Sequence, residues 1–264
     1  MESNYSKKQI YQSMNLETLR ERPLSFTSIK EFQKSPRHYI DYIQKQRTPP
    51  TDAMKLGSMV HCMLLQPELF NDQFAVAPEI NKRTNAGKEE WATFCSQHAD
   101  KIVVQEDDYQ HARRLVDTAM SNKSVEDTVK GCHDFEVEWS ADIEDLPFRG
   151  FFDGVASDYI LEVKTISDGH PKKVMSEFLN RKYHMQAGLY HMASFKPVIY
   201  LIIETSEPYL SYVAPADDRF LKLGCDDIGD LCTKFKKCLK TGDFSGGYDY
   251  EGEILITLPW SVDK

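Results

Sequence analysis

The sequence predicts a mixed α/β fold, with a central β-sheet flanked by helices and a helical N-terminal part. Apolar residues alternate with polar ones from Asp134 onward, a period typical of strands, and three such runs follow one another at short spacing. Helical periodicity precedes and follows these runs, and the order of helices, strands, helix, strands and helix fits layers packed around one sheet. The 264 residues, 41% of them hydrophobic, suffice for a sizeable core.

The N-terminal half is predicted to be helical. Pro36 interrupts an apolar pattern and separates two short helices, the first of them capped by Thr27 or Ser28. Further helices are predicted over residues 54–70, from about Lys88, and over residues 106–122. Residues 1–24 are polar and are expected to be flexible or loosely ordered, which leaves residues 25–264 as one domain.

The C-terminal half contains the strands. Residues 134–141, 147–157 and 159–167 are predicted to form an antiparallel meander. One long helix is predicted next, then two strands and a final amphipathic helix with a basic end; they span residues 175–195, 197–206, 208–215 and 218–242.

Charge and cysteine content limit the possible functions. With 41 acidic and 32 basic residues the net charge is −9, which argues against a protein that coats nucleic acid by bulk charge but not against a nuclease with a local basic patch. The sequence shows no signal peptide and no apolar run of membrane-spanning length, so a cytoplasmic location without membrane association is expected. The six cysteines form no C-x-x-C pair and are expected to be free thiols. The stretch "AGKEE" lacks the first glycine and the Ser or Thr of a phosphate-binding loop, so ATP binding is not expected.

Three charged residues stand in the most apolar part of the sequence. Glu162 and Lys164 lie two apart on a predicted buried strand and therefore point to the same face. Asp153, near the end of the preceding strand, can be brought beside Glu162 by the turn between them. Two converging carboxylates repel unless a cation neutralises them, and oxygen ligands suit Mg²⁺ or Mn²⁺. An adjacent ammonium group completes a set suited to phosphodiester hydrolysis, although an E-x-K pair alone is more often a buried salt bridge or part of a solvated strand face.

Five motifs in order resemble the RecB-like branch of the PD-(D/E)XK nuclease superfamily. Asp153…Glu162-Val163-Lys164 resembles the signature itself, and "SFTSIKEFQKSPRHY", "LGSMVH" and "YHMQAGLY" resemble the accessory motifs of that branch. "RTNAGKEEWATF" and "RKYHMQAGLY" are similar to the RecE-type exonuclease, also called exonuclease VIII. The resemblance covers most of residues 25–260 and implies a restriction-endonuclease-like core.

The resemblance also implies roles for individual residues. Asp153 and Glu162, with the carbonyl of Val163, are expected to bind a metal ion, which His61 and one further acid would help to bind. That acid is Glu136 or Glu138, which alternation places on one strand face; Glu136 is slightly preferred.

The remaining roles concern water and DNA. Lys164 is expected to activate or position the attacking water. Gln186 and Tyr190, four residues apart on one helical face, are expected to bond to that water, to the lysine or to a phosphate. Candidate DNA contacts are Arg37, His38, Lys82, Arg83, Lys88 and Tyr183.

The expected activity is Mg²⁺-dependent exonucleolytic digestion of linear double-stranded DNA, with Mn²⁺ able to substitute. The resemblance implies processive 5′→3′ degradation that leaves a 3′ single strand for a RecT-like annealing partner in phage or prophage recombination. It also implies a ring-shaped homo-oligomer, with a tetramer favoured. No iron–sulfur cluster is expected, because the spacing of the late cysteines does not match that of the cluster-binding relatives. The alternatives are a structure-specific endonuclease, a single-strand exonuclease, or an inactive protein that binds DNA ends.

Overall fold

The computed structural model of the chain describes residues 16–45 and 49–247. Most of the segment expected to be flexible, residues 1–15, lies outside this range. Backbone packing divides the chain into two compact units. The first unit comprises residues 1–46, 141–149 and 226–264, and the second comprises residues 47–140 and 150–225. The single domain expected over residues 25–264 stays a prediction.

The first unit begins with three helices, α2 (Leu16–Glu21), α3 (Phe26–Lys34) and α4 (Pro36–Gln44). Pro36 starts α4 as predicted, but the N-cap of α3 is Ser25 and not Thr27 or Ser28. Ser28 is instead the third helical residue, and its side chain accepts a hydrogen bond from the Ser25 N–H while Ser25 caps the Ser28 N–H. The unit's aromatic core consists of Phe32, Tyr39, Phe235 and Phe244.

The second unit begins with α5 (Asp52–Leu65), η1 (Pro67–Leu69) and α6 (Phe70–Gln73). A small parallel sheet pairs β1 (Phe74–Ala77) with β2 (Ile102–Gln105), and α7 (Asn85–Gln97) lies between them in the chain. Then follow α8 (Glu106–Ser121) and α9 (Lys123–Lys130). Strands β1 and β2 and helix α9 were not predicted, because segments of four to eight residues give little periodicity.

Five strands form the central sheet in the order β3-β4-β5-β6-β7. They are β3 (Cys132–Ile143), β4 (Leu146–Ala156), β5 (Ile160–Ile166), β6 (Val198–Glu204) and β7 (Ser211–Pro215). β4 and β5 are antiparallel, β5 and β6 parallel, and β6 and β7 antiparallel, so the sheet is mixed. The predicted meander and the two later strands are present, although the last strand starts at Ser211 and not at residue 208.

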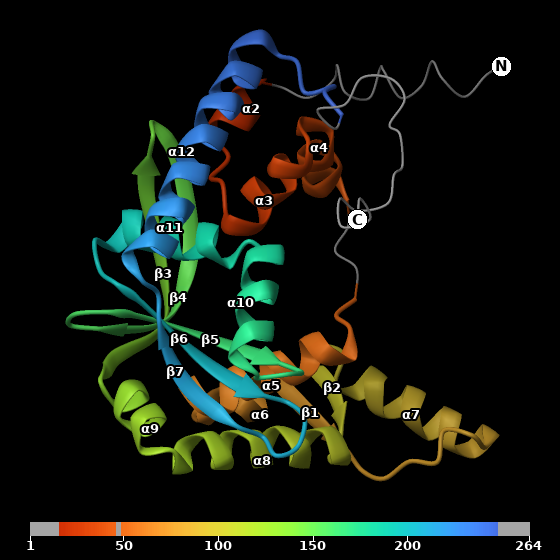
Figure 1. The fold of residues 1–264 in the computed structure, drawn as a ribbon. Coiled ribbons are helices and arrows are strands. Elements are labelled where there is room, and N and C mark those ends of the chain that lie inside the picture. The colour runs from red at the N-terminus through yellow and green to blue at the C-terminus, as the bar shows by residue number, and fades with distance from the viewer. Residues whose placement is uncertain (1–15, 46–48, 248–264) are drawn as a thin grey trace, which may run out of the picture. The chain divides into compact units, whose positions relative to one another are not determined.

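Helices cover both faces of the sheet in the second unit (Figure 1). Met59 of α5 and Leu115 of α8 share an apolar core with Leu161 and Val163 of β5. On the other face, the ring of Phe178 packs against Tyr200 of β6, with ring centroids 4.8 Å apart. The two sides of β5 therefore face different helices.

The long helix expected over residues 175–195 is two helices, α10 (Pro171–Asn180) and α11 (Tyr183–Ser194). The break occurs because Lys182 adopts a left-handed conformation with φ 64°, which a continuous helix cannot contain. The last helix, α12 (Asp218–Thr241), agrees with the prediction to within one residue.

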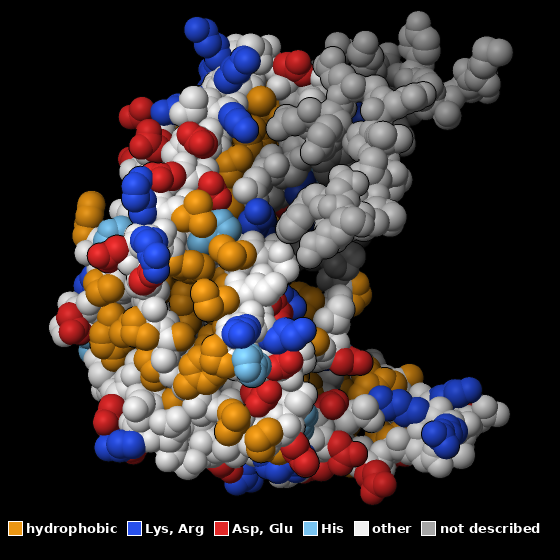
Figure 2. All heavy atoms as spheres, in the orientation of Figure 1, with side chains coloured by type: hydrophobic (Ala, Val, Ile, Leu, Met, Phe, Trp, Pro, Cys, Tyr) orange, Lys and Arg blue, Asp and Glu red, His pale blue; other side chains and the backbone are white. Residues whose placement is uncertain are grey.

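Charged side chains of both signs are interspersed on the face shown in Figure 2. None of the helices within residues 16–45 and 49–247 combines the length and apolar character needed to cross a bilayer.

Candidate active site

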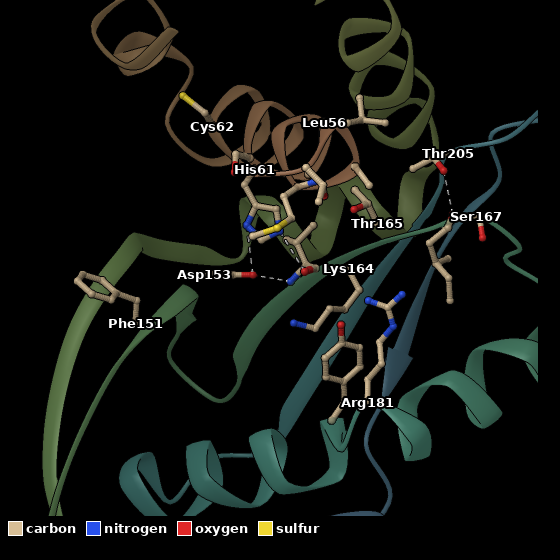
Figure 3. A pocket seen from close by; sticks show the side chains of 18 of the residues that line it. Leu56, His61, Cys62, Phe151, Asp153, Lys164, Thr165, Ser167, Arg181 and Thr205 are labelled. Carbon is tan, nitrogen blue, oxygen red and sulfur yellow. Dashed lines mark hydrogen bonds and ion pairs between the residues drawn. The ribbon is translucent and has the colours of Figure 1, made fainter. Parts of the chain in front are cut away.

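A pocket of about 890 Å³ within the second unit is lined by several of the predicted site residues, whereas Glu162, Gln186 and Tyr190 are buried behind it (Figure 3). Helix α5 forms one side, the end of α10 and the start of α11 form the other, and β4 and β5 lie between them. His61, Glu136, Asp153, Val163, Lys164 and Tyr183 all line this pocket.

Helix α5 approaches β5 closely at Gly57. A Cβ atom at that position would lie 3.3 Å from Oγ1 of Thr165, so a larger residue would crowd the Thr165 side chain. One turn later, Nε2 of His61 lies 3.1 Å from the carbonyl oxygen of Val163. The spacing of the G-x-x-x-H motif thus has a physical reason. The glycine lets the helix lie close to β5, and the histidine one turn later contacts the strand's backbone.

Asp153 lies where β4 and β5 part. The strands pair through Gly154 with Leu161 and Val155 with Ile160, and the next contact is made by a side chain: the Val163 N–H donates to Oδ2 of Asp153 at 2.7 Å. The same oxygen is 3.6 Å from Nδ1 of His61. A carboxylate therefore takes a backbone hydrogen bond that a strand would otherwise accept, and this fixes its position.

Glu136 reaches the same point from β3. Its Oε1 lies 3.9 Å from Nδ1 of His61. Its backbone is left-handed, with φ 51°, which costs a residue with a Cβ atom about 1–2 kcal/mol. The left-handed backbone at Glu136 interrupts the regular alternation of the strand. Glu138 therefore does not point to the cluster with Glu136, and it is exposed. Of the two acids left open by the sequence, the structure thus brings Glu136 to the cluster.

His61, Glu136 and Asp153 form a set that could hold a metal ion. One potential ligand atom from each lies within 4.8 Å of the others. Imidazole nitrogen and carboxylate oxygen suit a divalent cation such as Mg²⁺ or Mn²⁺, with oxygen preferred by the former.

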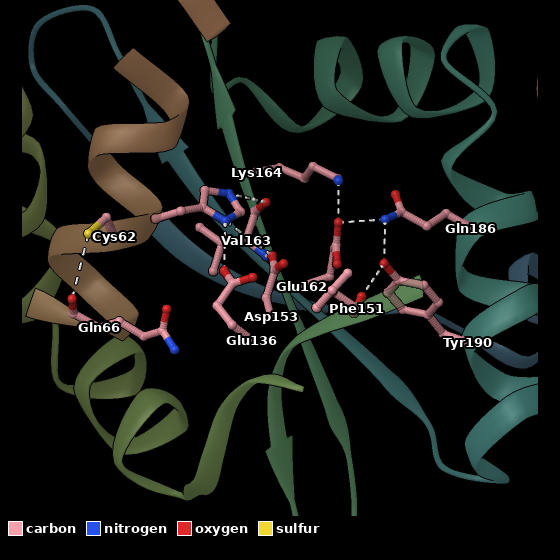
Figure 4. A network of polar contacts seen from close by, with 11 residues as sticks. Cys62, Gln66, Glu136, Phe151, Asp153, Glu162, Val163, Lys164, Gln186 and Tyr190 are labelled. Atoms are coloured by element: carbon pink, nitrogen blue, oxygen red, sulfur yellow. Dashed lines mark hydrogen bonds and ion pairs between the residues drawn. The ribbon is translucent and has the colours of Figure 1, made fainter. Parts of the chain in front are cut away.

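Glu162 is buried beside this set, with 3% of its surface exposed (Figure 4). Its Oε1 accepts hydrogen bonds from Lys164 Nζ and from Gln186 Nε2, the latter at 2.7 Å. Its Oε2 has no hydrogen-bond partner among the described residues. A buried carboxylate oxygen without a partner is costly, so this atom fits a site that takes up a cation.

Electrostatics within the cluster are strongly coupled. Burial raises the pKa of Asp153, although His61 and Lys164 oppose this. Burial and the charge of Asp153 likewise raise the pKa of Glu162, against the opposing effect of Lys164. Both acids therefore resist ionisation until a cation compensates their charge.

The two basic groups respond in the opposite way to burial. Burial lowers the pKa of His61, but the charge of Asp153 and the nearby carboxylate of Glu136 outweigh it and the net pKa is raised. Burial also lowers the pKa of Lys164, but Glu162 more than compensates, so the pKa is raised. Lys164 is therefore an ammonium group, and its Nζ lies 4.4 Å from the ring centroid of Tyr183.

Gln186 and Tyr190 share one face of α11, as their spacing predicts. The Gln186 amide donates to Glu162 and to Oη of Tyr190, the latter at 2.9 Å. Tyr190 in turn donates to the carbonyl of Phe151 at 2.8 Å. Gln186 thus bonds to the carboxylate of Glu162, a partner that the sequence interpretation had not named for it.

The other candidate DNA contacts lie outside this cluster. Lys82 stacks on Trp91 with Nζ 3.3 Å from the ring centroid, and Arg83 and Lys88 are exposed. Arg37 belongs to the first unit. Their roles stay predictions.

Phe151 and Arg181 also line the pocket, although sequence reasoning had named neither of them. Arg181 makes an ion pair with Glu177, with Nε and Oε1 2.6 Å apart. A signal for Phe151 existed: it lies two residues before Asp153, which on a strand is the same face.

A family model described as "PDDEXK-like domain of unknown function (DUF3799)" matches residues 25–249. The chain belongs to this PDDEXK-like family. This membership, together with the mixed sheet flanked by helices, confirms the predicted fold class and the resemblance to the PD-(D/E)XK superfamily. Family membership also supports a nuclease.

One solved structure agrees at the level of the fold. A protein from Eubacterium rectale, provisionally named an exonuclease, matches with a TM-score of 0.61 and 9% identity over 97% of this chain and 96% of that chain. An alkaline exonuclease from Laribacter hongkongensis covers 67% of this chain and 95% of its own, at 11% identity and a TM-score of 0.32, too distant to carry an argument. No curated protein matches the PDDEXK-like chain.

Proposed function

We propose that the protein is a Mg²⁺-dependent DNA exonuclease of the RecE type. The observation that carries the proposal is the convergence of His61, Glu136 and Asp153 beside the buried Glu162, whose Oε2 has no partner among the described residues. Membership of a PDDEXK-like family supports nuclease chemistry at this pocket.

The four residues of this cluster would hold the metal ion. A bound Mg²⁺ or Mn²⁺ supplies Lewis-acid stabilisation of the negative charge that develops on the phosphate. Asp153 is fixed by the Val163 N–H, and Glu162 is fixed by Gln186, so both ligands are oriented before DNA binds.

Lys164 has a distinct part in this proposal. As an ammonium group it has no lone pair to accept a proton, so it acts as a donor and not as a general base. It can orient the attacking water or donate to a phosphate oxygen that gains charge during hydrolysis. Tyr183 and Glu162 hold its ammonium group in place.

The finer features of the proposal are supported by motif resemblance. We propose processive 5′→3′ digestion of double-stranded DNA, a RecT-like annealing partner, a tetrameric ring and a cytoplasmic location. The ring would reconcile a net charge of −9 with DNA binding, since only the channel need be basic. Arg37, Lys82, Arg83, Lys88 and Tyr183 are the proposed DNA contacts.

One assay tests the activity. Linear duplex DNA, with or without a 5′-phosphate and labelled at either end, and closed circular DNA are each incubated with Mg²⁺, Mn²⁺ or EDTA. We expect linear DNA to be degraded only with metal, and circles to survive. Degradation of circles would indicate an endonuclease, preference for single strands would indicate a single-strand exonuclease, and binding of ends without cleavage would indicate an accessory protein.

Variants test the site assignment. Asp153→Ala and Lys164→Ala should abolish hydrolysis while DNA binding persists, and Glu138→Ala, which changes an exposed acid near the site, should retain full activity. Full activity in either of the first two variants would refute the assignment. Light scattering of the purified protein tests the proposed tetramer separately.

A further inference from the structure

Phe151 presents an aromatic ring to the pocket. It lies on β4 two residues before Asp153, lines the same pocket and is 52% exposed. The next residue, Phe152, is 6% exposed and stacks on Trp139 with ring centroids 5.4 Å apart. Of the two consecutive phenylalanines, one belongs to the core and the other faces the site.

Exposure alone does not imply a role, because single apolar side chains are common on protein surfaces. Phe195, for example, is 87% exposed and is not a lining residue of this pocket. Phe151 differs because its backbone is fixed: its carbonyl accepts the hydrogen bond from Tyr190, which is bonded to Gln186 and through it to Glu162 (Figure 4). The backbone that carries the ring is therefore held by the same network that orients a catalytic carboxylate.

The pocket offers two kinds of contact on its two sides. Figure 3 shows Phe151 and Arg181 on opposite sides of Asp153 and Lys164. A nucleotide presents a charged phosphate and a flat, largely apolar base. Lys164 and Arg181, although each is paired with a glutamate, offer donors that match the former, and an exposed aromatic ring matches the latter, since aromatic side chains stack on bases of any sequence.

We propose that the ring of Phe151 stacks on the nucleobase of the terminal nucleotide, beside the phosphodiester bond that is cleaved. This inference rests on the proposed function and assigns a substrate-binding group to it. Stacking tolerates every base, so the contact would select for an unpaired or frayed end without selecting a sequence.

A double-mutant cycle between protein and DNA tests this contact. Binding is measured with Ca²⁺ in place of Mg²⁺ for short duplexes whose 5′- or 3′-terminal nucleotide is either intact or abasic. The proteins are the wild type, Phe151→Ala, Phe151→Trp and the matched surface control Phe195→Ala. We expect Phe151→Ala to weaken binding of intact ends at least about fivefold and to leave binding of the corresponding abasic ends unchanged.

The other variants complete the expected pattern. Phe151→Trp should bind intact ends at least as tightly as the wild type, and Phe195→Ala should match the wild type on all DNAs. Equal losses in Phe151→Ala on intact and abasic ends would mean that the residue is only structural and would overturn the stacking contact, as would no loss at all. The same preparations are assayed for cleavage with Mg²⁺. If the wild type cleaves DNA but Phe151→Ala and the abasic end show no coupling in binding, only this inference is overturned. If the wild type neither cleaves nor binds DNA, the proposed function is overturned as well.

Discussion

The hydrogen bond from Gln186 to Glu162 can be removed with little change in volume by Gln186→Met. The amide donates to Oε1 of Glu162 at 2.7 Å in a buried setting. A hydrogen bond to a charged group contributes about 1.5–3 kcal/mol, which corresponds to a change of about 10- to 100-fold. We therefore expect the rate of DNA cleavage at a fixed Mg²⁺ concentration to fall by about that factor, and the Mg²⁺ concentration at half-maximal rate to rise.

Two comparisons isolate this bond. Tyr190→Phe leaves the bond from Gln186 to Glu162 in place and removes only neutral hydrogen bonds, with Gln186 and with the carbonyl of Phe151, each worth about 0.5–1.5 kcal/mol, and should cost less. In the Glu162→Gln background, Gln186→Met should lower the cleavage rate hardly any further, because the carboxylate charge that Gln186 bonds to has already been removed. Unchanged cleavage and metal dependence in the single variant, or a full additional loss in the double variant, would refute the view that Gln186 acts through Glu162.

Three further predictions concern metal, packing and pH. Glu136→Ala should weaken Mn²⁺ binding at least about tenfold in calorimetric titration, whereas Glu138→Ala should not; equal effects would contradict the metal cluster. Gly188→Ala should lower Tm by about 5 °C or more, because its Cβ would lie 2.4 Å from the carbonyl carbon of Gly224. As a control, Gly229→Ala has open space around it and should raise the free energy of unfolding by about 0.5–1 kcal/mol. Glu162→Gln tests the raised pKa of the Glu162 carboxyl. Because the pKa is raised, this group contributes fully to the free energy of unfolding below its unfolded pKa of about 4.3, and the contribution is lost as pH rises. Denaturant melts in EDTA should therefore show the variant gaining stability relative to the wild type between about pH 4 and pH 7. A shift in favour of the wild type would mean that Lys164 dominates.

The fold was predictable where periodicity extended over enough residues. The meander that carries Asp153 and Glu162 follows from strand alternation in the sequence, and Pro36 marks a true helix start. The break between α10 and α11 gave no signal, because Arg181 and Lys182 both favour helices and neither Gly nor Pro is present. Tertiary packing, and not local preference, decides the conformation of Lys182.

The site was predictable only where the sequence itself carried an unusual pattern. Charge in an apolar strand singled out Glu162 and Lys164, but the involvement of His61 and Gln186 came only from motif resemblance. Alternation alone could not separate Glu136 from Glu138, because it assumes regular strand geometry and the left-handed φ of Glu136 departs from it. Phe151 was missed because its spacing from Asp153 places both residues on one strand face but does not by itself indicate a role.

The backbone at Glu136 has a consequence for laboratory evolution. A glycine would adopt φ 51° without penalty, so Glu136→Gly should make the protein more resistant to heat while it removes a carboxylate from the cluster. Screens for thermal tolerance and screens for nuclease activity would therefore select opposite residues at this single position. A library enriched only for heat resistance would accumulate inactive members there, and the frequency of glycine at residue 136 would report on which pressure had acted.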